Sequence, residues 1–230
     1  MLNSKIVAVS NAKGGVGKSL NALMLAIRAA EKQKKVLLIG AEHDGAFAPN
    51  SPKFKIENLD VISDVARDPD FAKKIGLYRQ QYDLIVVDLP GNNLTIEHAE
   101  LDGFAEKMIK NILVKSDLVV IPIEPSEDSV RKTYSFIKNL HGLAKATRRK
   151  INQLILPTNT KKGNVISEQV LNAIDKFPVP KAVKPIRASE DLKKAFAKRQ
   201  GVWTFKQGAL VNNDLTPVHN QIFEILGINE

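Results

Sequence analysis

A glycine-rich turn with two lysines lies close to the start of the chain. It occupies residues 11–19 and reads Asn-Ala-Lys-Gly-Gly-Val-Gly-Lys-Ser. Gly14, Gly15 and Gly17 allow a tight backbone curl, so that successive N–H groups point toward one anion. The turn follows a short apolar run and opens a helical pattern, whose amino end also favours negative charge. These residues therefore predict a phosphate-binding loop.

The last two residues of the turn suit a nucleoside triphosphate and its metal ion. We expect Lys18 to neutralise the β- and γ-phosphates and Ser19 to bind Mg²⁺. The turn departs from the ordinary Walker A pattern, because Ala12 replaces the first glycine and Lys13 adds a second cation. A plain glycine turn would not explain Lys18 and Ser19 at the start of a helix.

The elements around this loop alternate between strands and helices. Apolar runs predict strands at 5–10, 35–39, 59–62, 83–88, 117–122, 151–157 and 182–186. Helical periodicity predicts helices at 19–32, 70–81, 96–114, 127–143, 164–176, 189–199 and 215–226. Together they indicate an α/β fold with one doubly wound, mostly parallel sheet and helices on both faces. Because no linker interrupts the 230 residues, we expect a single domain over 1–230.

Asp88 ends the apolar strand expected at 83–88 and is followed by Leu-Pro-Gly. A carboxylate at the carboxyl end of a strand beside a phosphate loop suits a Walker B role, in which it holds hydrated Mg²⁺. A strand-terminal Asp also caps turns in many proteins. Its combination with the loop favours the metal role.

Composition limits the partners and the chemistry. The formal net charge of +9 favours a polyanion such as nucleic acid or an anionic membrane, although a basic, inert surface would give the same count. The absence of cysteine excludes disulfides, thiolate metal sites and cysteine nucleophiles. The first residues do not form a signal peptide, and no apolar run reaches the ~20 residues of a membrane span. The expected compartment is the cytoplasm.

The run from Lys13 to Ser19 resembles the deviant Walker A motif of the ParA/MinD family of ATPases. That resemblance extends through 82–91 and 116–126 and implies ATP and Mg²⁺ as cofactors, a P-loop fold and an ATP-dependent homodimer. It implies that Lys13 reaches the nucleotide of the partner subunit, as an arginine finger would. The loop residues that would bind ATP are Lys13, Gly14, Gly15, Val16, Gly17, Lys18, Ser19 and Leu20.

The family usually carries Asp-x-Asp after its second strand, and this chain departs from that pattern. Gly40 stands at the first acid and Glu42 at the second, followed by His43. By resemblance Glu42 would position the attacking water, so that Lys13, Lys18 and Glu42 form the catalytic set. We expect slow hydrolysis that rises when Gly40 is replaced by Asp.

The resemblance also implies a base site late in the chain and a DNA surface beyond it. Asn159 and Pro185 are the candidate base contacts, although Asn in a polar turn is nearly as common. The candidate DNA contacts, which we call the late cluster, are Lys181, Lys184, Arg187, Lys193, Lys194, Lys198 and Arg199. A solvated helix face is the alternative interpretation of that cluster.

The function implied is that of a small ParA-like partition ATPase. It would dimerise with ATP, bind nucleoid DNA without sequence preference, and be released when a centromere-binding or adaptor protein stimulates hydrolysis. Two alternatives are a MinD-like membrane-positioning switch, which the acidic end of the chain disfavours, and a scaffold that scarcely hydrolyses ATP. Metabolic and metal-handling relatives that rely on cysteine are disfavoured.

Overall fold

The computed structural model describes residues 4–41, 45–47, 55–63, 65, 68, 70–91, 103–205 and 208–228. Its strands are β1 (Lys5–Val9), β2 (Val36–Gly40), β3 (Leu59–Ser63), β4 (Leu84–Asp88), β5 (Leu118–Ile123) and β6 (Gln153–Pro157). Its helices are α1 (Lys18–Glu31), α2 (Phe71–Tyr78), α3 (Gly103–Lys115), α4 (Glu127–Thr147), α5 (Val165–Ile174), α6 (Glu190–Lys198), the 3₁₀ helix η2 (Val202–Thr204) and α7 (Ala209–Leu226).

The strands form one six-stranded sheet in the order β3-β2-β4-β1-β5-β6, and the pairs between neighbouring strands are parallel. β1 lies between β4 and β5, so the chain leaves β1 toward one side of the sheet and later crosses to the other. Ligands of open α/β sheets bind at such a switch point, outside the carboxyl ends of the strands. The glycine-rich turn follows β1 at this edge.

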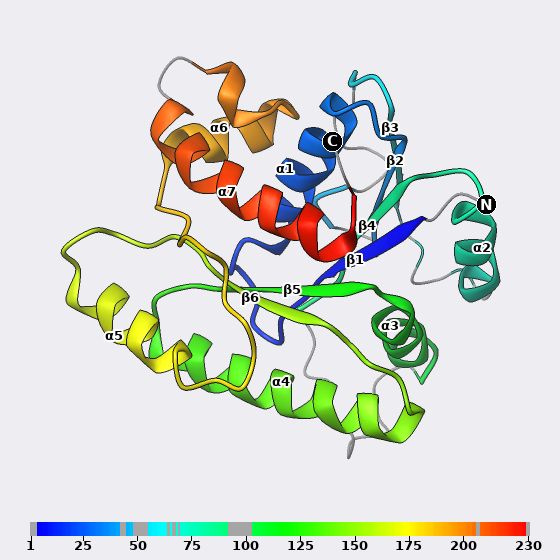
Figure 1. Ribbon diagram of the computed structural model, residues 1–230, viewed down its shortest axis with the longest axis horizontal. Coiled ribbons are helices and arrows are strands. Elements are labelled where there is room, and N and C mark those ends of the chain that lie inside the picture. Colours follow the sequence, from blue (N-terminus) through cyan, green and yellow to red (C-terminus); the bar gives the residue numbers. More distant parts are fainter. Residues whose placement is uncertain are drawn as a thin grey trace.

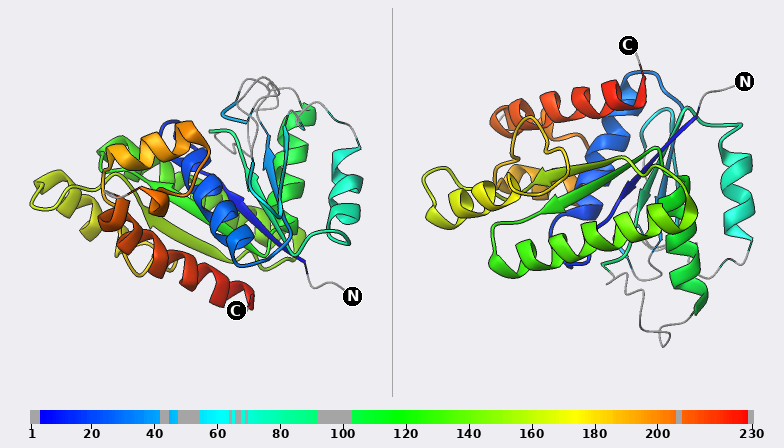
Figure 2. Two further views of the ribbon diagram at one scale, coloured as in Figure 1. Left: turned by 90° about the horizontal axis from the view of Figure 1, so that it is seen from above. Right: turned by 60° about the horizontal axis from the view of Figure 1, so that its bottom comes forward.

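Alternation along each strand divides the core into two halves, one on each face of the sheet. Val7 and Val9 of β1 pack on the side of α1 and α7, whereas Ile6 and Ala8 pack on the side of α3 and α4. Figures 1 and 2 show α1, α6 and α7 on one side of the sheet and α4 with α5 on the other. The predicted doubly wound α/β fold is confirmed.

The strand predicted at 182–186 is wrong. Two isolated bridges flank the segment, Ile155 with Lys181 and Thr160 with Arg187, and no strand forms in the described stretch between them. Pro185 has no N–H to donate, which prevents a continuous ladder there.

The last helix begins earlier than periodicity predicts, at Ala209, and contains Pro217 in its interior. Proline removes the hydrogen bond to the carbonyl four residues earlier, which belongs to Asn213. The Asn213 carbonyl instead accepts a hydrogen bond from Lys184 Nζ at 3.1 Å. A contact from a distant loop thus offsets the local cost of the proline.

Two sequence-based expectations fall outside the described residues. They are the role of Glu42 and the start of the helix expected at 96–114, of which α3 is the described part. Among the described residues, no helix is both long and apolar enough to cross a membrane.

Candidate nucleotide-binding site

The glycine-rich turn lies between the end of β1 and the start of α1. Gly15 and Gly17 have φ angles of 78° and 87°, in the left-handed region that glycine adopts at little cost. Gly17 is also the N-cap of α1, so the first free N–H groups of the helix open directly onto the turn. This geometry fits an anion held by backbone N–H groups and a helix dipole.

Lys18 and the turn after β4 lie against the same part of the loop. Lys18 is buried, and its Nζ donates a hydrogen bond to the Lys13 carbonyl at 3.1 Å. A Cβ placed on Gly91 would stand 3.1 Å from Lys18 Nζ and 3.2 Å from the Gly14 nitrogen. Gly91 therefore permits a close approach of the turn behind Asp88 to the lysine and the loop, and a Cβ there would make tight contacts with both.

Three polar side chains fix the shape of the loop. The Asn11 amide donates to the Pro122 carbonyl at 2.7 Å and to the Thr133 hydroxyl at 2.8 Å. The Thr158 hydroxyl donates to the Val16 carbonyl at 2.9 Å. The Asn21 amide donates to the Gly17 carbonyl at 2.7 Å.

Asn11, Thr158 and Asn21 were missed by the sequence analysis. The available signal was a polar residue at the end of β1, another at the end of β6 and a third in the first turn of α1. Because their partners come from β5, α4 and the loop itself, only the tertiary structure identifies them as supports of the loop.

Lys13 is held by side chains that follow β5. Its Nζ lies 2.9 Å from Glu124 Oε1, 3.0 Å from Ser126 Oγ and 3.6 Å from Asp128 Oδ2. The hydrogen bond to Glu124 raises the pKa of Lys13, with a smaller contribution from Asp128. The charge of Lys13 is thus fixed at the rim of the loop by its own chain.

Asp88 and Ser19 are positioned at the same edge of the sheet. Asp88 is buried and pairs in register with Val9 on one side and Gly40 on the other. Ser19 lies in the first turn of α1, directly after Lys18. One hydroxyl and one carboxylate beside a phosphate loop are a donor set that fits Mg²⁺, which usually binds one or two protein oxygens together with phosphates and water.

Gly40 has a packing role that the sequence did not indicate. A Cβ there would stand 2.8 Å from Cβ of Phe47 and 3.1 Å from its Cδ2. Phe47 is itself buried, so the ring cannot simply move into solvent. The glycine is therefore required by the loop that returns over β2, whatever its effect on metal geometry.

A hollow beside the loop brings together one of the two base-site candidates, Asn159, and Leu20 of the expected ATP-binding residues. Leu20 and Asn159 line it with Gly15, Val16 and Gly17 of the loop and with Ile186, Arg187, Ala188 and Lys193 from the segment leading into α6. Asn159 has a φ of 54°, which turns the chain sharply after β6. Pro185 lines a neighbouring hollow instead, next to Thr160 and Asp214.

The segment along this hollow is anchored to α7 by Asp214. The carboxylate accepts hydrogen bonds from Arg187 Nε at 2.6 Å and Nη2 at 3.0 Å, and Lys184 Nζ lies 3.3 Å away. Burial by itself raises the pKa of Asp214, but the hydrogen bonds from Arg187 and Lys184 outweigh it and leave this pKa below its usual value. Arg187 and Lys184 are therefore bound within the chain.

The rest of the late cluster is also largely engaged. Lys181 pairs with Asp175, Lys193 with Glu190 at 2.7 Å and Lys194 with Asp191 at 3.8 Å. Arg199 is buried, donates to the Ala46 carbonyl and lies over the rings of Phe47 and Phe196. Lys198 Nζ lies 5.6 Å from the centroid of the Phe205 ring. Burial of Arg199 is unsuited to a phosphate contact, and the paired lysines offer less net charge than their number suggests.

This fold and loop define the class of P-loop nucleotide-binding proteins, and comparison with known proteins narrows it. A family model described as an AAA domain matches residues 4–50, which contain β1, the loop, α1 and β2. The curated Protein ParA of Rhizobium radiobacter is 26% identical over 121 residues, or 52% of this chain. The alignment covers 49% of that relative, so the chain spans about half the length of the curated protein that it matches.

Solved structures extend the similarity of fold to the whole chain. Cyanothece McdA in its ATP complex is 16% identical with a TM-score of 0.72, covering 100% of this chain and 99% of that one. MinD of Pyrococcus horikoshii with Mg-ADP is 15% identical with a TM-score of 0.71, covering 98% of each chain. A putative plasmid partition protein of Borrelia burgdorferi bound to AMPPNP is 21% identical with a TM-score of 0.67, covering 96% of this chain and 98% of that one. The predicted resemblance to the ParA/MinD family of P-loop ATPases is confirmed.

Proposed function

We propose that this protein, acting as one domain over residues 1–230, is a ParA-like positioning ATPase. It binds ATP with Mg²⁺, forms a homodimer in that state, binds DNA without sequence preference and is reset by slow hydrolysis. The observation that carries the proposal is the loop at the carboxyl edge of the sheet, with Lys18 buried inside it and Lys13 at its rim. A loop with Lys18 but without Lys13 would support nucleotide binding but would give no reason to propose a homodimer.

The loop and Lys18 bind and orient the phosphates. Gly15 and Gly17 have positive φ angles that suit a loop whose N–H groups hold an anion, and Lys18 provides a cation close to the loop backbone. Ser19 and Asp88 would hold the metal, which when bound neutralises charge that develops on the phosphates. Gly91 lies next to Lys18 and Gly14. The turn after β4 would therefore move when a γ-phosphate binds beside Lys18.

Lys13 must change partners to act on a second subunit. In the described chain it contacts Glu124, Ser126 and Asp128, which lie after β5. If the Lys13 side chain moves to the nucleotide bound by the facing subunit, its ammonium exchanges these oxygens for phosphate oxygens, which carry more negative charge. Dimerisation would then depend on the triphosphate, because the new partner exists only when nucleotide is bound.

The described part of α7 supports the partition interpretation over the MinD-like one. Its sequence from Ala209 to Leu226 contains no lysine or arginine, and Leu215, Val218, Ile222 and Phe223 are buried in the core. Membrane-binding helices need an apolar face that is available to lipid and cations beside it. Here that face already covers the sheet.

The proposal is tested by measuring nucleotide binding, molecular mass and DNA binding in parallel. Calorimetry should detect ATP binding with Mg²⁺ that Lys18→Ala removes. Sedimentation should give a dimer with ATP and a monomer with ADP, and two unrelated duplexes should bind more tightly to the ATP form. Phosphate release should be slow. An ATP-bound protein that stays monomeric and binds DNA no better than the ADP form would refute the switch.

A further inference from the structure

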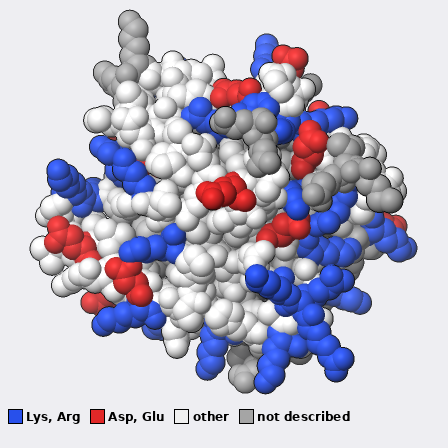
Figure 3. All heavy atoms as spheres, viewed as in Figure 1, with Lys and Arg blue, Asp and Glu red and all other residues white. Residues whose placement is uncertain are grey.

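A cluster of positive charge lies at the edge of the sheet opposite to the nucleotide site. Helices α2, α3 and α4 end there, just before β4, β5 and β6 begin. The basic residues around these ends, which we call the amino-edge patch, are Arg79, Lys107, Lys110, Lys115, Lys145, Arg148, Arg149 and Lys150. Figure 3 shows Lys and Arg side chains gathered at the lower right, over the end of α4 that Figure 1 places there.

The patch is hollowed on both sides of α3. One hollow, of about 520 Å³, is lined by Arg79, Lys115, Arg149 and Lys150 among others. The second, of about 390 Å³, is lined by Lys107 and Lys110 with residues of α4. Both hollows include Asn111 and Val114, so they adjoin along one helix. Positive charge therefore lines two neighbouring hollows on this surface.

Few acids oppose this charge among the described residues. Glu106 pairs with Lys110 at 2.5 Å, and Asp117 pairs with Arg79 at 3.0 Å. These two ion pairs engage two of the eight basic side chains of the patch. The carboxyl ends of three helices add about −1.5 elementary charges, at −0.5 each. Neutralisation of the helix dipoles therefore accounts for only part of the positive charge of the patch.

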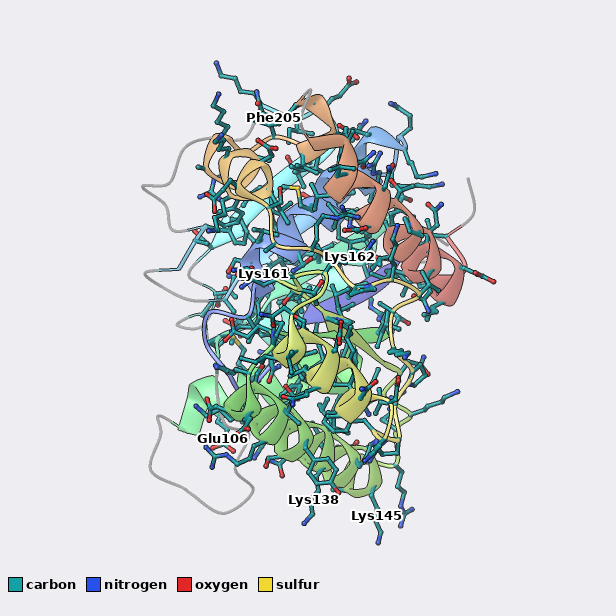
Figure 4. All side chains as sticks on the ribbon, turned by 90° about the vertical axis from the view of Figure 1, so that its left-hand side faces the viewer. Glu106, Lys138, Lys145, Lys161, Lys162 and Phe205 are labelled. Carbon is teal, nitrogen blue, oxygen red and sulfur yellow. The ribbon has the colours of Figure 1, made fainter. Side chains whose placement is uncertain are left out.

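Pairing with acids of the same chain distinguishes the late cluster from the basic end of α4. Every residue from Lys145 to Lys150 is exposed, in a run that contains Arg148 and Arg149. Figure 4 shows Lys145 pointing away from the body of the protein at the end of α4. In the late cluster, by contrast, Lys193 and Arg187 are held by acids of the same chain. A polyanion would meet the exposed cations from Lys145 to Lys150 with less prior pairing to break than in the late cluster.

We propose that the amino-edge patch binds the phosphate backbone of double-stranded nucleic acid. The lining of both hollows contains no aromatic side chain, whereas single strands are usually held by base stacking on aromatic rings. Its aliphatic members Ile75, Val114 and Leu143 are buried or half-buried, so they offer little to insert into a membrane. Dispersed cations along these two hollows match the sequence-independent contacts that phosphates make.

This inference rests on the proposed nucleic-acid partner but assigns it a second surface, far from the nucleotide. The patch lies at the strand starts, and the phosphate loop follows the strand ends. Binding through the patch should therefore persist without ATP, and ATP-dependent dimerisation would add to it by doubling the contacts. The protein could then keep a weak hold on the duplex after its subunits separate.

The test compares three triple variants of the full chain on one DNA duplex and one RNA duplex, without nucleotide, across a salt series. The patch variant is Lys145→Ala with Arg149→Ala and Lys150→Ala. The late-cluster variant is Lys193→Ala with Lys194→Ala and Lys198→Ala. The charge control is Lys161→Ala with Lys162→Ala and Lys176→Ala, three exposed lysines near α5. Each triple removes the same charge from the formal +9.

We expect the patch variant alone to lose at least tenfold in affinity, with a log–log salt slope shallower by about 2.7 for three lost phosphate contacts. A loss seen with the DNA duplex identifies the partner as DNA, and a loss seen with the RNA duplex identifies it as RNA. Equal losses in the charge control would overturn the site, as would a patch variant with the parent's affinity and slope. Loss of binding to phosphatidylserine vesicles with unchanged duplex binding would assign the patch to a membrane and also overturn it.

Two further measurements keep the result interpretable. Arg148→Gly serves as a second variant, since Arg148 ends α4 with a φ of 51° that glycine adopts without strain. It should lower duplex affinity in the same direction while the thermal melt of the protein is preserved. With ATP added, failure of the parent to bind more tightly would refute the proposed switch but leave the patch intact.

Discussion

Lys13 and Glu124 form an ion pair of 2.9 Å across the rim of the phosphate loop. The pair joins the lysine that distinguishes this loop to the first residue after β5, and Ser126 and Asp128 complete the set of oxygens. A lysine proposed to act on another subunit thus has defined partners in its own chain. Its release becomes part of the proposed dimerisation step.

Lys13→Ala should leave nucleotide binding by the monomer within about twofold of the parent, because Lys18 remains the cation inside the loop. The variant should lose ATP-dependent dimerisation and most phosphate release, because no cation crosses to the facing nucleotide. Calorimetry and sedimentation with ATP measure the two effects. Lys162→Ala, an exposed lysine remote from the loop, is the matched control. Normal dimerisation of the Lys13 variant would count against the two-subunit site.

Gly40→Asp should destabilise the protein rather than restore faster hydrolysis, which revises the expectation from sequence alone. The new Cβ would stand 2.8 Å from that of buried Phe47, and strain of this kind costs about 1–3 kcal/mol. Denaturant unfolding should show the loss in Gly40→Ala as well, because the clash begins at Cβ. A Gly40→Asp variant as stable as the parent, with faster phosphate release, would restore the original expectation.

Asp214→Asn should loosen the segment that lines the hollow beside the loop. The substitution removes the charge that Arg187 and Lys184 share, and hydrogen bonds to charged groups contribute about 1.5–3 kcal/mol. We expect a loss of about 2 kcal/mol in unfolding free energy and weaker ATP binding, since Arg187 lines the hollow. Asp191→Asn, whose partner Lys194 is 3.8 Å away on the surface, should change neither quantity appreciably.

His219 should make the protein lose stability as the pH falls. Burial, with help from nearby Arg28, lowers the pKa of His219 from 6.5 to about 3. Between these values the unfolded chain binds more protons than the folded one, so the unfolding free energy falls by up to about 1.4 kcal/mol per pH unit. This contribution is absent above pH 6.5, where the imidazole is neutral in both states.

The pH effect is measured by comparing chemical unfolding of the parent and His219→Gln from pH 7.5 to 5. The variant should show a smaller slope, even if its stability at pH 7.5 is lower because Trp203 loses its ring contact. His141→Gln on the surface of α4 provides the matched change and should keep the parent's slope. Identical slopes for all three proteins would exclude His219 as the source of acid sensitivity.

The sequence by itself determined the phosphate loop and the class of fold, because both are encoded in contiguous residues. Three glycines and a lysine between an apolar run and a helical pattern need no distant partner to be recognised. Continuous apolar strands, such as the one ending at Asp88, specify a sheet covered on both faces. Helix ends were predicted less well, since Pro217 marks a helix start in most contexts. Here the contact between Lys184 and the Asn213 carbonyl permits the helix to begin earlier.

Only the tertiary structure decided which charges are free and which glycine is obligatory. The late cluster counts as seven cations in the sequence, but Asp214 holds Arg187 from a helix 27 residues further on. In the sequence, Gly40 indicates the loss of an acidic residue. In the structure, Phe47 packs against Gly40 and leaves no room for a side chain. The amino-edge patch combines the ends of three helices that are separate in the chain. Coulomb and packing forces act between neighbours in space, and the order of strands in the sheet decides which residues become neighbours.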